Sequence, residues 1–303
     1  MFCLPDMPDW ETEGRDWPNR EASRFVKAAG LTWHIQETGP TDGSAPLVLL
    51  IHGTAGATHS WRGLVPLLAG RFRLVAPDLP GHGFTDMPET HRLSLPGMAR
   101  SVRGLVETLG LAPDLVIGHS AGAAILIRMA LDRAIAPKGI LSLNGALKPF
   151  PGVAGYIFPQ LAKLLFLNPV TPRLFSWSTG HGAHVERLIV DMGSTIDREG
   201  LDLYTRLFSN AGHVTGALGM MANWDLHRLS RELPNLSVPL LLVAAEKDKA
   251  VPPHVAQDVA AEVPGARALP MPQLGHLAHE ERPDLVAAVV TEWAASLGLD
   301  GAA

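Results

Sequence analysis

The sequence predicts an α/β protein with a doubly wound, mostly parallel sheet into which a helical segment is inserted. Short apolar runs bounded by turn residues, which suit buried parallel strands, alternate with segments of helical periodicity. Between residues 147 and 231 this alternation stops, and Pro, Phe, Trp, Met and His accumulate. We therefore expect a core formed by residues 1–146 and 232–303, with residues 147–231 as an inserted helical cap.

Six segments have the composition of buried strands. They lie at residues 47–51, 73–76, 115–117, 139–143, 240–244 and, with a weaker signal, 266–271. Helical spacing is clearest at Met98, Val102 and Leu105, where Ser94 is the expected N-cap. A last helix is expected at about residues 283–297. Because strands that alternate with such helices form right-handed crossovers, helices should cover both faces of the sheet.

The strongest chemical signal is a Gly-x-Ser-x-Gly motif at residues 118–122, between a strand and an apolar helix. In that context the motif is typical of a nucleophile elbow, a sharp turn that exposes the serine at the carboxyl end of the sheet. Glycine is needed two residues before and after the serine, because side chains there would collide with the neighbouring strand and helix. Ser120 is therefore the predicted nucleophile.

A second loop of small residues follows the strand at residues 47–51. Acyl transfer needs two backbone N–H groups directed at the developing oxyanion, and a loop without bulky side chains lets them approach. We assign these donors to Thr54 and Ala121. The side chain of His52 is expected to brace the loop.

A serine nucleophile needs a base, and the base needs a carboxylate that orients it. Asp248 follows the strand at residues 240–244 and is the predicted acid, with Glu246 as the alternative. His276 lies in a loop before the last helix and is the predicted base, with His279 as the alternative. Ser, acid and His then follow one another along the chain in the order Ser120, Asp248, His276.

The other histidines of interest are expected to be structural. His82 belongs to a turn-rich segment at residues 78–86, in which Gly and Pro fix the backbone. His181, His184 and His213 lie in the predicted cap, without nearby carboxylates or cysteines that would complete a metal site. We predict no metal and no cofactor.

Composition argues against several other classes of protein. The net charge is −5, with no basic run that would bind nucleic acid. The most apolar stretch, residues 154–170, contains Pro159 and Lys163 and is shorter than the roughly 20 residues of a spanning helix. Cys3 is the single cysteine, and residues 1–20 carry more acidic than basic side chains without a long apolar run. A cytoplasmic protein in a reducing compartment is therefore expected.

Taken in order, these motifs resemble those of the α/β-hydrolase superfamily over essentially the whole chain. The resemblance rests on His52 and Gly53, residues 78–86, residues 118–122, Asp248 and His276. It implies the α/β-hydrolase fold and, as the first hypothesis, a hydrolase that acts on an ester or related acyl bond. The superfamily also includes carbon–carbon bond hydrolysis and perhydrolysis. Dehalogenation would require a carboxylate in place of Ser120.

A narrower resemblance is carried by residues 33–36, 118–124, 220–226 and 275–281. These segments are similar to those of the magnesium-chelatase accessory proteins of bacteriochlorophyll-making bacteria. The resemblance implies a place near the insertion of magnesium into protoporphyrin, with magnesium chelatase as a partner and a tetrapyrrole as a ligand. It does not fix the reaction.

Two functions are consistent with these motifs and resemblances. The first is hydrolysis of a small apolar substrate through Ser120, and the complete set of three catalytic residues favours it. The alternative is a non-hydrolytic accessory protein that binds a porphyrin under the cap while its triad is idle. In either case the predicted substrate contacts are Trp224, which would stack on a flat apolar ligand, together with Met221 and His119.

Overall fold

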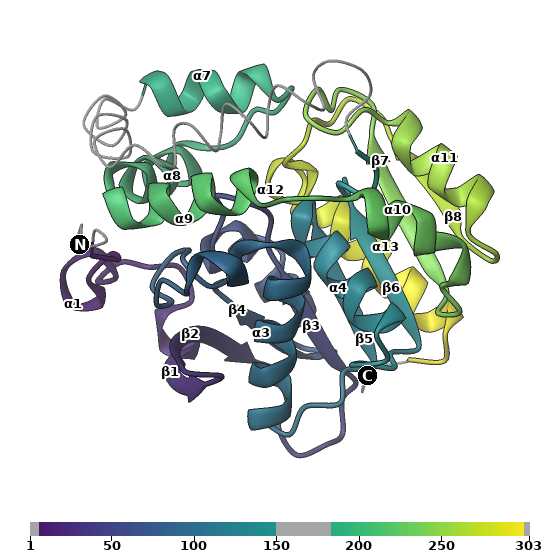
Figure 1. The fold of residues 1–303 in the computed structure, drawn as a ribbon, viewed down its shortest axis with the longest axis horizontal. Coiled ribbons are helices and arrows are strands. Elements are labelled where there is room, and N and C mark those ends of the chain that lie inside the picture. The colour runs from purple at the N-terminus through teal and green to yellow at the C-terminus, as the bar shows by residue number, and fades with distance from the viewer. Residues whose placement is uncertain (1–5, 150–182, 300–303) are drawn as a thin grey trace.

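An eight-stranded sheet organises the described residues of the computed structural model, which are 6–149 and 183–299 (Figure 1). The strands are β1 (Ser23–Ala28), β2 (Leu31–Thr38), β3 (Leu47–Ile51), β4 (Arg73–Pro77), β5 (Leu115–His119), β6 (Gly139–Leu143), β7 (Leu240–Ala245) and β8 (Arg267–Met271). Their order across the sheet is β1-β2-β4-β3-β5-β6-β7-β8. The pairs from β4 to β8 are parallel, whereas β1–β2 and β2–β4 are antiparallel.

All six predicted strands are confirmed, as β3 to β8. The antiparallel pair at the edge, β1 and β2, was not predicted. Most side chains of β1 are not buried, and β2 buries the polar residues His34 and Gln36 beside Trp33 and Ile35. Neither strand therefore shows the short apolar run that identified the others.

Helices connect the strands as the periodicity predicts. The α-helices of the described residues are α1 (Trp10–Glu13), α2 (Val65–Leu68), α3 (Leu95–Thr108), α4 (Ala121–Leu131), α7 (Ala183–Asp191), α8 (Arg198–Ser209), α9 (Ala211–Ala222), α10 (His227–Glu232), α11 (His254–Glu262), α12 (Ala278–Glu281) and α13 (Pro283–Ser296). Short 3-10 helices are η1 (Arg20–Ala22), η2 (Thr58–Trp61), η3 (Thr90–Leu93) and η4 (Leu233–Asn235). Ser94 caps α3 by accepting a hydrogen bond from the amide of Gly97, as expected.

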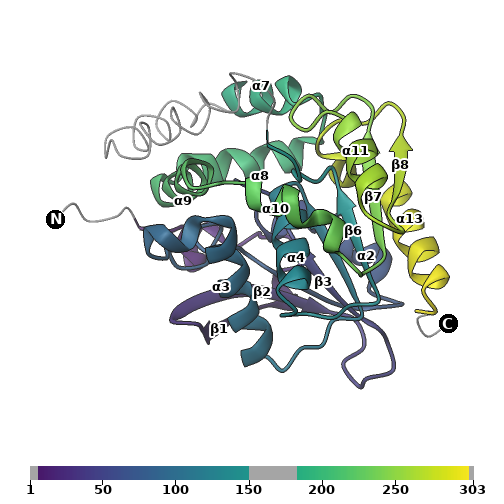
Figure 2. The same cartoon turned by 45° about the vertical axis from the view of Figure 1, so that its right-hand side comes forward.

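The central strands contribute side chains to two hydrophobic layers, one on each face of the sheet. In β3, Leu49 and Ile51 join the layer that contains α3 and α4, whereas Val48 and Leu50 join the layer that contains α13. Figure 2 shows these helices on opposite faces of the sheet. Burial on both faces explains why these strands are almost uniformly apolar.

The described part of the predicted cap is helical, and no strand is assigned between residues 183 and 231. Helices α7, α8 and α9 lie together at one end of the sheet (Figures 1 and 2). Contacts from α9 to Ala55 and Gly83, in the loops after β3 and β4, place it at the carboxyl ends of these strands. The predicted boundaries stay a prediction, because residues 150–182 lie outside the described residues. None of the described helices is long and apolar enough to cross a membrane.

Candidate active site

Ser120 occupies a strained turn between β5 and α4, with φ 50° and ψ −116°. A Cβ atom on Gly118 would lie 2.4 Å from the amide nitrogen of Ala123, and one on Gly122 would lie 2.1 Å from the carbonyl oxygen of Ile51. The first collision is with the helix after the serine and the second with the neighbouring strand. Both glycines are therefore required sterically, which is the reason given for them from the sequence.

The loop after β3 packs directly against this turn. A Cβ atom on Gly53 would lie 3.0 Å from Cβ of Ser120 and 2.8 Å from Nδ1 of His119. Among the described residues, no hydrogen-bond acceptor is found for the backbone N–H of Thr54 or of Ala121. Neither amide is engaged by another described residue, and their assignment to an oxyanion hole stays a prediction.

Asp248 and His276 form a buried pair, with Nδ1 of His276 2.8 Å from Oδ2 of Asp248. The amides of Ala250 and Val251 each donate to Oδ1 of Asp248 at 2.8 Å. Asn144 donates from Nδ2 to the same Oδ2 at 2.7 Å. With all acceptor positions engaged, the carboxylate has one orientation and fixes the ring of His276.

Asn144 was missed by the sequence analysis. It follows β6 directly and has a left-handed backbone with φ 50°. Its position after a predicted strand, at the carboxyl edge of the sheet, is a signal that could have drawn attention to it. The link to Asp248, 104 positions later, is set by the fold alone.

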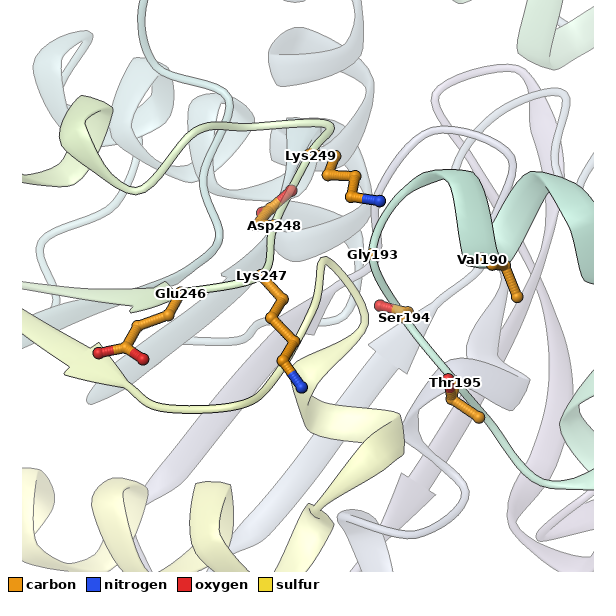
Figure 3. A pocket seen from close by; sticks show the side chains of 8 residues that line it. All are labelled: Val190, Gly193, Ser194, Thr195, Glu246, Lys247, Asp248 and Lys249. Atoms are coloured by element: carbon orange, nitrogen blue, oxygen red, sulfur yellow. The ribbon is translucent and has the colours of Figure 1, made fainter.

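The alternative acid and base lie elsewhere. Glu246 is exposed, and Figure 3 shows it on the far side of its loop from Ser194. His279 is fully buried, with its ring 4.8 Å from that of Trp61, and neither of its nitrogens has a partner among the described residues. Of the four candidates, the structure brings Asp248 and His276 together.

In the described residues Ser120 Oγ makes no hydrogen bond to His276. Such a bond often forms only when a ligand binds.

The three predicted substrate contacts have different surroundings. His119 is buried, and its Nε2–H donates to the carbonyl of His276 at 2.9 Å. Trp224 packs against the main hydrophobic layer, whereas Met221 is 45% exposed. The preceding Met220 is buried, and its sulfur accepts a hydrogen bond from the Thr54 hydroxyl at 3.6 Å. Met220 is thus the methionine that touches the loop after β3.

A pocket of about 390 Å³ lies beside Asp248 (Figure 3). Its described lining residues are Val190, Gly193, Ser194, Thr195, Glu246, Lys247, Asp248 and Lys249. Ser120 is not among them. The hydroxyl of Ser194 accepts a hydrogen bond from the Leu277 amide at 2.8 Å, which ties the inserted segment to the loop that carries His276.

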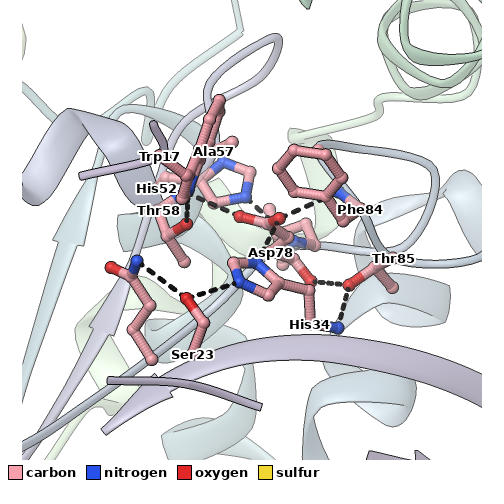
Figure 4. Close-up of polar contacts among 12 residues, drawn as sticks. Trp17, Ser23, His34, His52, Ala57, Thr58, Asp78, Phe84 and Thr85 are labelled. Atoms are coloured by element: carbon pink, nitrogen blue, oxygen red, sulfur yellow. Dashed lines mark hydrogen bonds and ion pairs between the residues drawn. The ribbon is translucent and has the colours of Figure 1, made fainter. Parts of the chain in front are cut away.

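A second buried polar network surrounds Asp78 (Figure 4). Its carboxylate accepts hydrogen bonds from the amides of Thr58 and Phe84 and from Nδ1 of His34, at 2.6, 2.9 and 2.8 Å. Nε2 of His34 lies 3.0 Å from the hydroxyl of Ser23. Burial raises the pKa of Asp78, but His34 and the amide of Phe84 outweigh it and hold that pKa well below its usual value.

A profile of the alpha/beta hydrolase family matches residues 48–289, which include β3 from its second residue, β4 to β8 and every predicted catalytic residue. The chain belongs to the α/β hydrolase family.

The narrower resemblance is also confirmed. The chain is 40% identical over 286 residues to the magnesium-chelatase 30 kDa subunit of Rhodobacter capsulatus, covering 92% of this chain and 96% of that protein. It is 28% identical over 283 residues to haloalkane dehalogenase 2 of Mycobacterium tuberculosis, covering 90% of this chain and 94% of the relative.

Solved structures agree on the fold. The epoxide hydrolase CorEH superimposes with a TM-score of 0.76 at 22% identity, covering 91% of this chain and 99% of that one. An α/β hydrolase fold protein from Burkholderia ambifaria gives a TM-score of 0.77 at 20% identity, covering 95% and 99% of the two chains. At these identities the likeness concerns the fold alone.

Proposed function

We propose that this protein is a serine hydrolase that cleaves an ester or related acyl bond through Ser120, His276 and Asp248. The observation that carries the proposal is the buried 2.8 Å contact between His276 and Asp248, in a chain whose Ser120 has the strained backbone of an elbow. A serine at this position also separates the chain from carboxylate-dependent chemistry such as dehalogenation.

In the proposed reaction the hydroxyl of Ser120 attacks the acyl carbon and gives its proton to Nε2 of His276. Asp248 accepts the hydrogen bond from Nδ1–H and stabilises the imidazolium that forms. The amides of Thr54 and Ala121 donate to the oxyanion. His276 then protonates the leaving alcohol, and water releases the acyl group from Ser120 by the reverse sequence.

We propose an apolar substrate connected with magnesium-porphyrin synthesis, such as a tetrapyrrole ester, with magnesium chelatase as a partner. Support for the pathway comes from the 40% identity with the magnesium-chelatase 30 kDa subunit. An apolar substrate is consistent with Met220, an apolar side chain in contact with Thr54 beside the proposed oxyanion donor. Pockets for such ligands are mainly apolar with few polar groups.

The test is labelling with a fluorophosphonate probe followed by mass mapping of the modified peptide. Modification of Ser120 that is lost in His276→Ala supports the hydrolase, because the probe reacts only with an activated serine. An unmodified Ser120 in folded wild-type protein contradicts it.

A second candidate is a porphyrin-binding accessory protein without hydrolytic activity, and the similarity to the magnesium-chelatase 30 kDa subunit favours it. Titration with protoporphyrin and its magnesium and methyl-ester forms, followed by tryptophan quenching, tests this candidate. An aromatic contact contributes about 0.5–1.5 kcal/mol, so Trp224→Ala should weaken binding at least several-fold. Equal binding by wild type and Ser120→Ala, without ester hydrolysis, would favour the accessory protein. Absence of saturable binding would exclude the porphyrin ligand.

A further inference from the structure

His213 lies on the inserted helix α9 and is fully buried. Both of its ring nitrogens are engaged by the core. Nδ1 is 3.1 Å from the amide nitrogen of Gly83, and Nε2 is 3.1 Å from the carbonyl oxygen of Ala55. Because an amide can only donate and a carbonyl can only accept, the ring is the neutral tautomer with its proton on Nε2. Burial lowers the pKa of His213 to about 4, which keeps the ring neutral near pH 7.

His52 engages the same two loops from the side of the core. Its Nδ1–H donates to the carbonyl of Gly53 at 2.7 Å, and its Nε2 accepts from the amide of Leu79 at 2.8 Å. This confirms the expected bracing role. The two histidines use opposite tautomers, and together they hold the carbonyls of Gly53 and Ala55, on either side of Thr54.

The carbonyl of Gly53 and the N–H of Thr54 belong to one planar trans peptide, so they point in opposite directions. Holding that carbonyl therefore sets the direction of the Thr54 N–H. The amide of Gly56 also donates to the carbonyl of Gly53, at 3.1 Å, which closes a four-residue turn. The geometry of this turn decides where the oxyanion donor lies.

Ala55 is the strained residue of the turn, with φ 63°. A positive φ at the third position of a turn favours glycine, and a residue with a Cβ atom adopts it at a cost of about 1–2 kcal/mol. The bond from His213 to the carbonyl of Ala55 compensates for this strain. Without this hydrogen bond the turn would relax toward a less strained conformation, and the Thr54 amide would move with the turn.

Helix α9 approaches the loops closely enough to make this bond specific. A Cβ atom on Gly216 would lie 1.8 Å from the carbonyl oxygen of Gly81, so only glycine permits the approach. One turn further on, Met220 accepts the hydrogen bond from Thr54. His213, Gly216 and Met220 thus lie at successive turns on the face of α9 that meets the two loops.

We propose that His213 is a positioning residue that holds the Thr54–Ala55 turn in the conformation of a working oxyanion hole, so that the inserted helix completes the active site. The inference rests on the proposed hydrolase function. It assigns His213 to the reaction through Thr54, and neither to a metal nor to the substrate.

The experiment measures the rate at which fluorophosphonate modifies Ser120 in full-length variants. His213→Leu should slow the phosphonylation step about 10- to 100-fold, less than the roughly 10²–10³ lost when an oxyanion donor is removed. Reversible binding of the probe should not change. His213→Gln, which retains a donor and an acceptor, should keep most of the rate. His227→Leu, an exposed histidine on α10, is the matched control and should match wild type.

A double variant separates positioning from general damage. Glycine adopts a positive φ without strain, so Ala55→Gly should recover part of the rate lost in His213→Leu. Because relief of the strain at Ala55 also stabilises the fold, urea denaturation of both variants checks that the recovered rate does not simply follow a recovered stability. Modification at the wild-type rate in His213→Leu would overturn the proposal. So would a loss that is equally large in His213→Gln and that Ala55→Gly does not relieve. If His213→Leu does not fold, His213→Asn replaces it, because the shorter amide reaches at most one of the two partners.

Hydrogen exchange distinguishes this proposal from the hydrolase assignment. The amide of Gly56 reports on the turn because it donates to Gly53. Faster exchange of the Gly56 amide in His213→Leu supports the positioning role of His213. If wild-type Ser120 then proves unreactive, only the hydrolase function fails. Unchanged exchange of the Gly56 amide contradicts the positioning role of His213, whatever the activity of the variant.

Discussion

Two regions of this protein contain serine, histidine and aspartate close together, and only one has the features of an active site. At the sheet edge, Ser23 contacts His34 at 3.0 Å, and His34 contacts Asp78 at 2.8 Å. At the carboxyl ends of the central strands, His276 contacts Asp248 at the same 2.8 Å, beside the loop that carries Ser120. Judged by hydrogen bonds alone, the edge network is the more complete of the two.

The backbone separates the two regions. Ser23 begins an ordinary strand with φ −82° and ψ 137°, and its hydroxyl accepts a hydrogen bond from Gln36. Ser120 has φ 50° at the N-terminus of α4 and faces the small-residue loop at Gly53. A nucleophile needs an exposed hydroxyl and N–H donors for the oxyanion, as well as a base. The strained backbone of Ser120 beside this loop, rather than the number of hydrogen bonds, therefore supports Ser120 and not Ser23 as the proposed nucleophile.

The sharpest test of the comparison removes each serine in turn. Ser120→Ala should abolish turnover of any ester substrate, by roughly 10⁶ in kcat if the three residues act as a unit. Ser23→Ala should leave kcat unchanged, because the edge network is structural. The measurement is kcat for an activated ester, with probe labelling mapped to Ser120 or Ser23. Near-wild-type activity in Ser120→Ala would reject the mechanism, and labelling of Ser23 would break the comparison.

The two candidate acids at the loop after β7 give the next largest effect. Asp248→Asn should lower kcat by roughly 10⁴, because the side-chain amide that replaces Oδ2 would force His276 into the wrong tautomer. Glu246 is exposed, so Glu246→Gln should change kcat much less. Steady-state rates of both variants on one ester show which carboxylate acts as the acid. A reversed ranking would transfer the role of the acid to Glu246.

Asp78→Asn should act on stability instead. The carboxylate accepts from three donors on separate segments, and an amide would turn its own N–H₂ toward one of them. Breaking a buried pair of this kind costs about 3–5 kcal/mol of the free energy of unfolding. Urea denaturation of Asp78→Asn beside wild type measures it. A stability equal to wild type would show that the edge network contributes nothing.

Acid pH should weaken the edge network gradually. The folded-state pKa of Asp78 is depressed, so its contribution to stability is present above the unfolded value of about 3.9 and is lost as the pH falls toward the folded-state value. The difference in unfolding free energy between wild type and Asp78→Asn should therefore shrink between about pH 5 and pH 2. Urea denaturation at a series of pH values follows it, and a difference independent of pH would contradict the assignment.

The sequence by itself determined the central sheet and the candidate residues at the carboxyl ends of its strands. Local patterns are sufficient there, because a strand buried on both faces must be apolar, and an elbow must have glycine where Gly118 and Gly122 collide with backbone. The order of Ser120, Asp248 and His276 relative to the strands was equally legible. The edge strands β1 and β2 were not, because their exposed and polar residues lack an apolar run.

Only the tertiary structure decided which distant side chains contact the loops of the candidate site. Asn144 reaches Asp248 across 104 positions, and His213 reaches Ala55 across 158. It also decided between neighbours that the sequence leaves equivalent, since Met220 is buried against Thr54 while Met221 is exposed. Such contacts depend on how a helix packs on loops that are distant in the chain. No local periodicity records that packing, because the side chains involved carry no pattern until the fold brings them together.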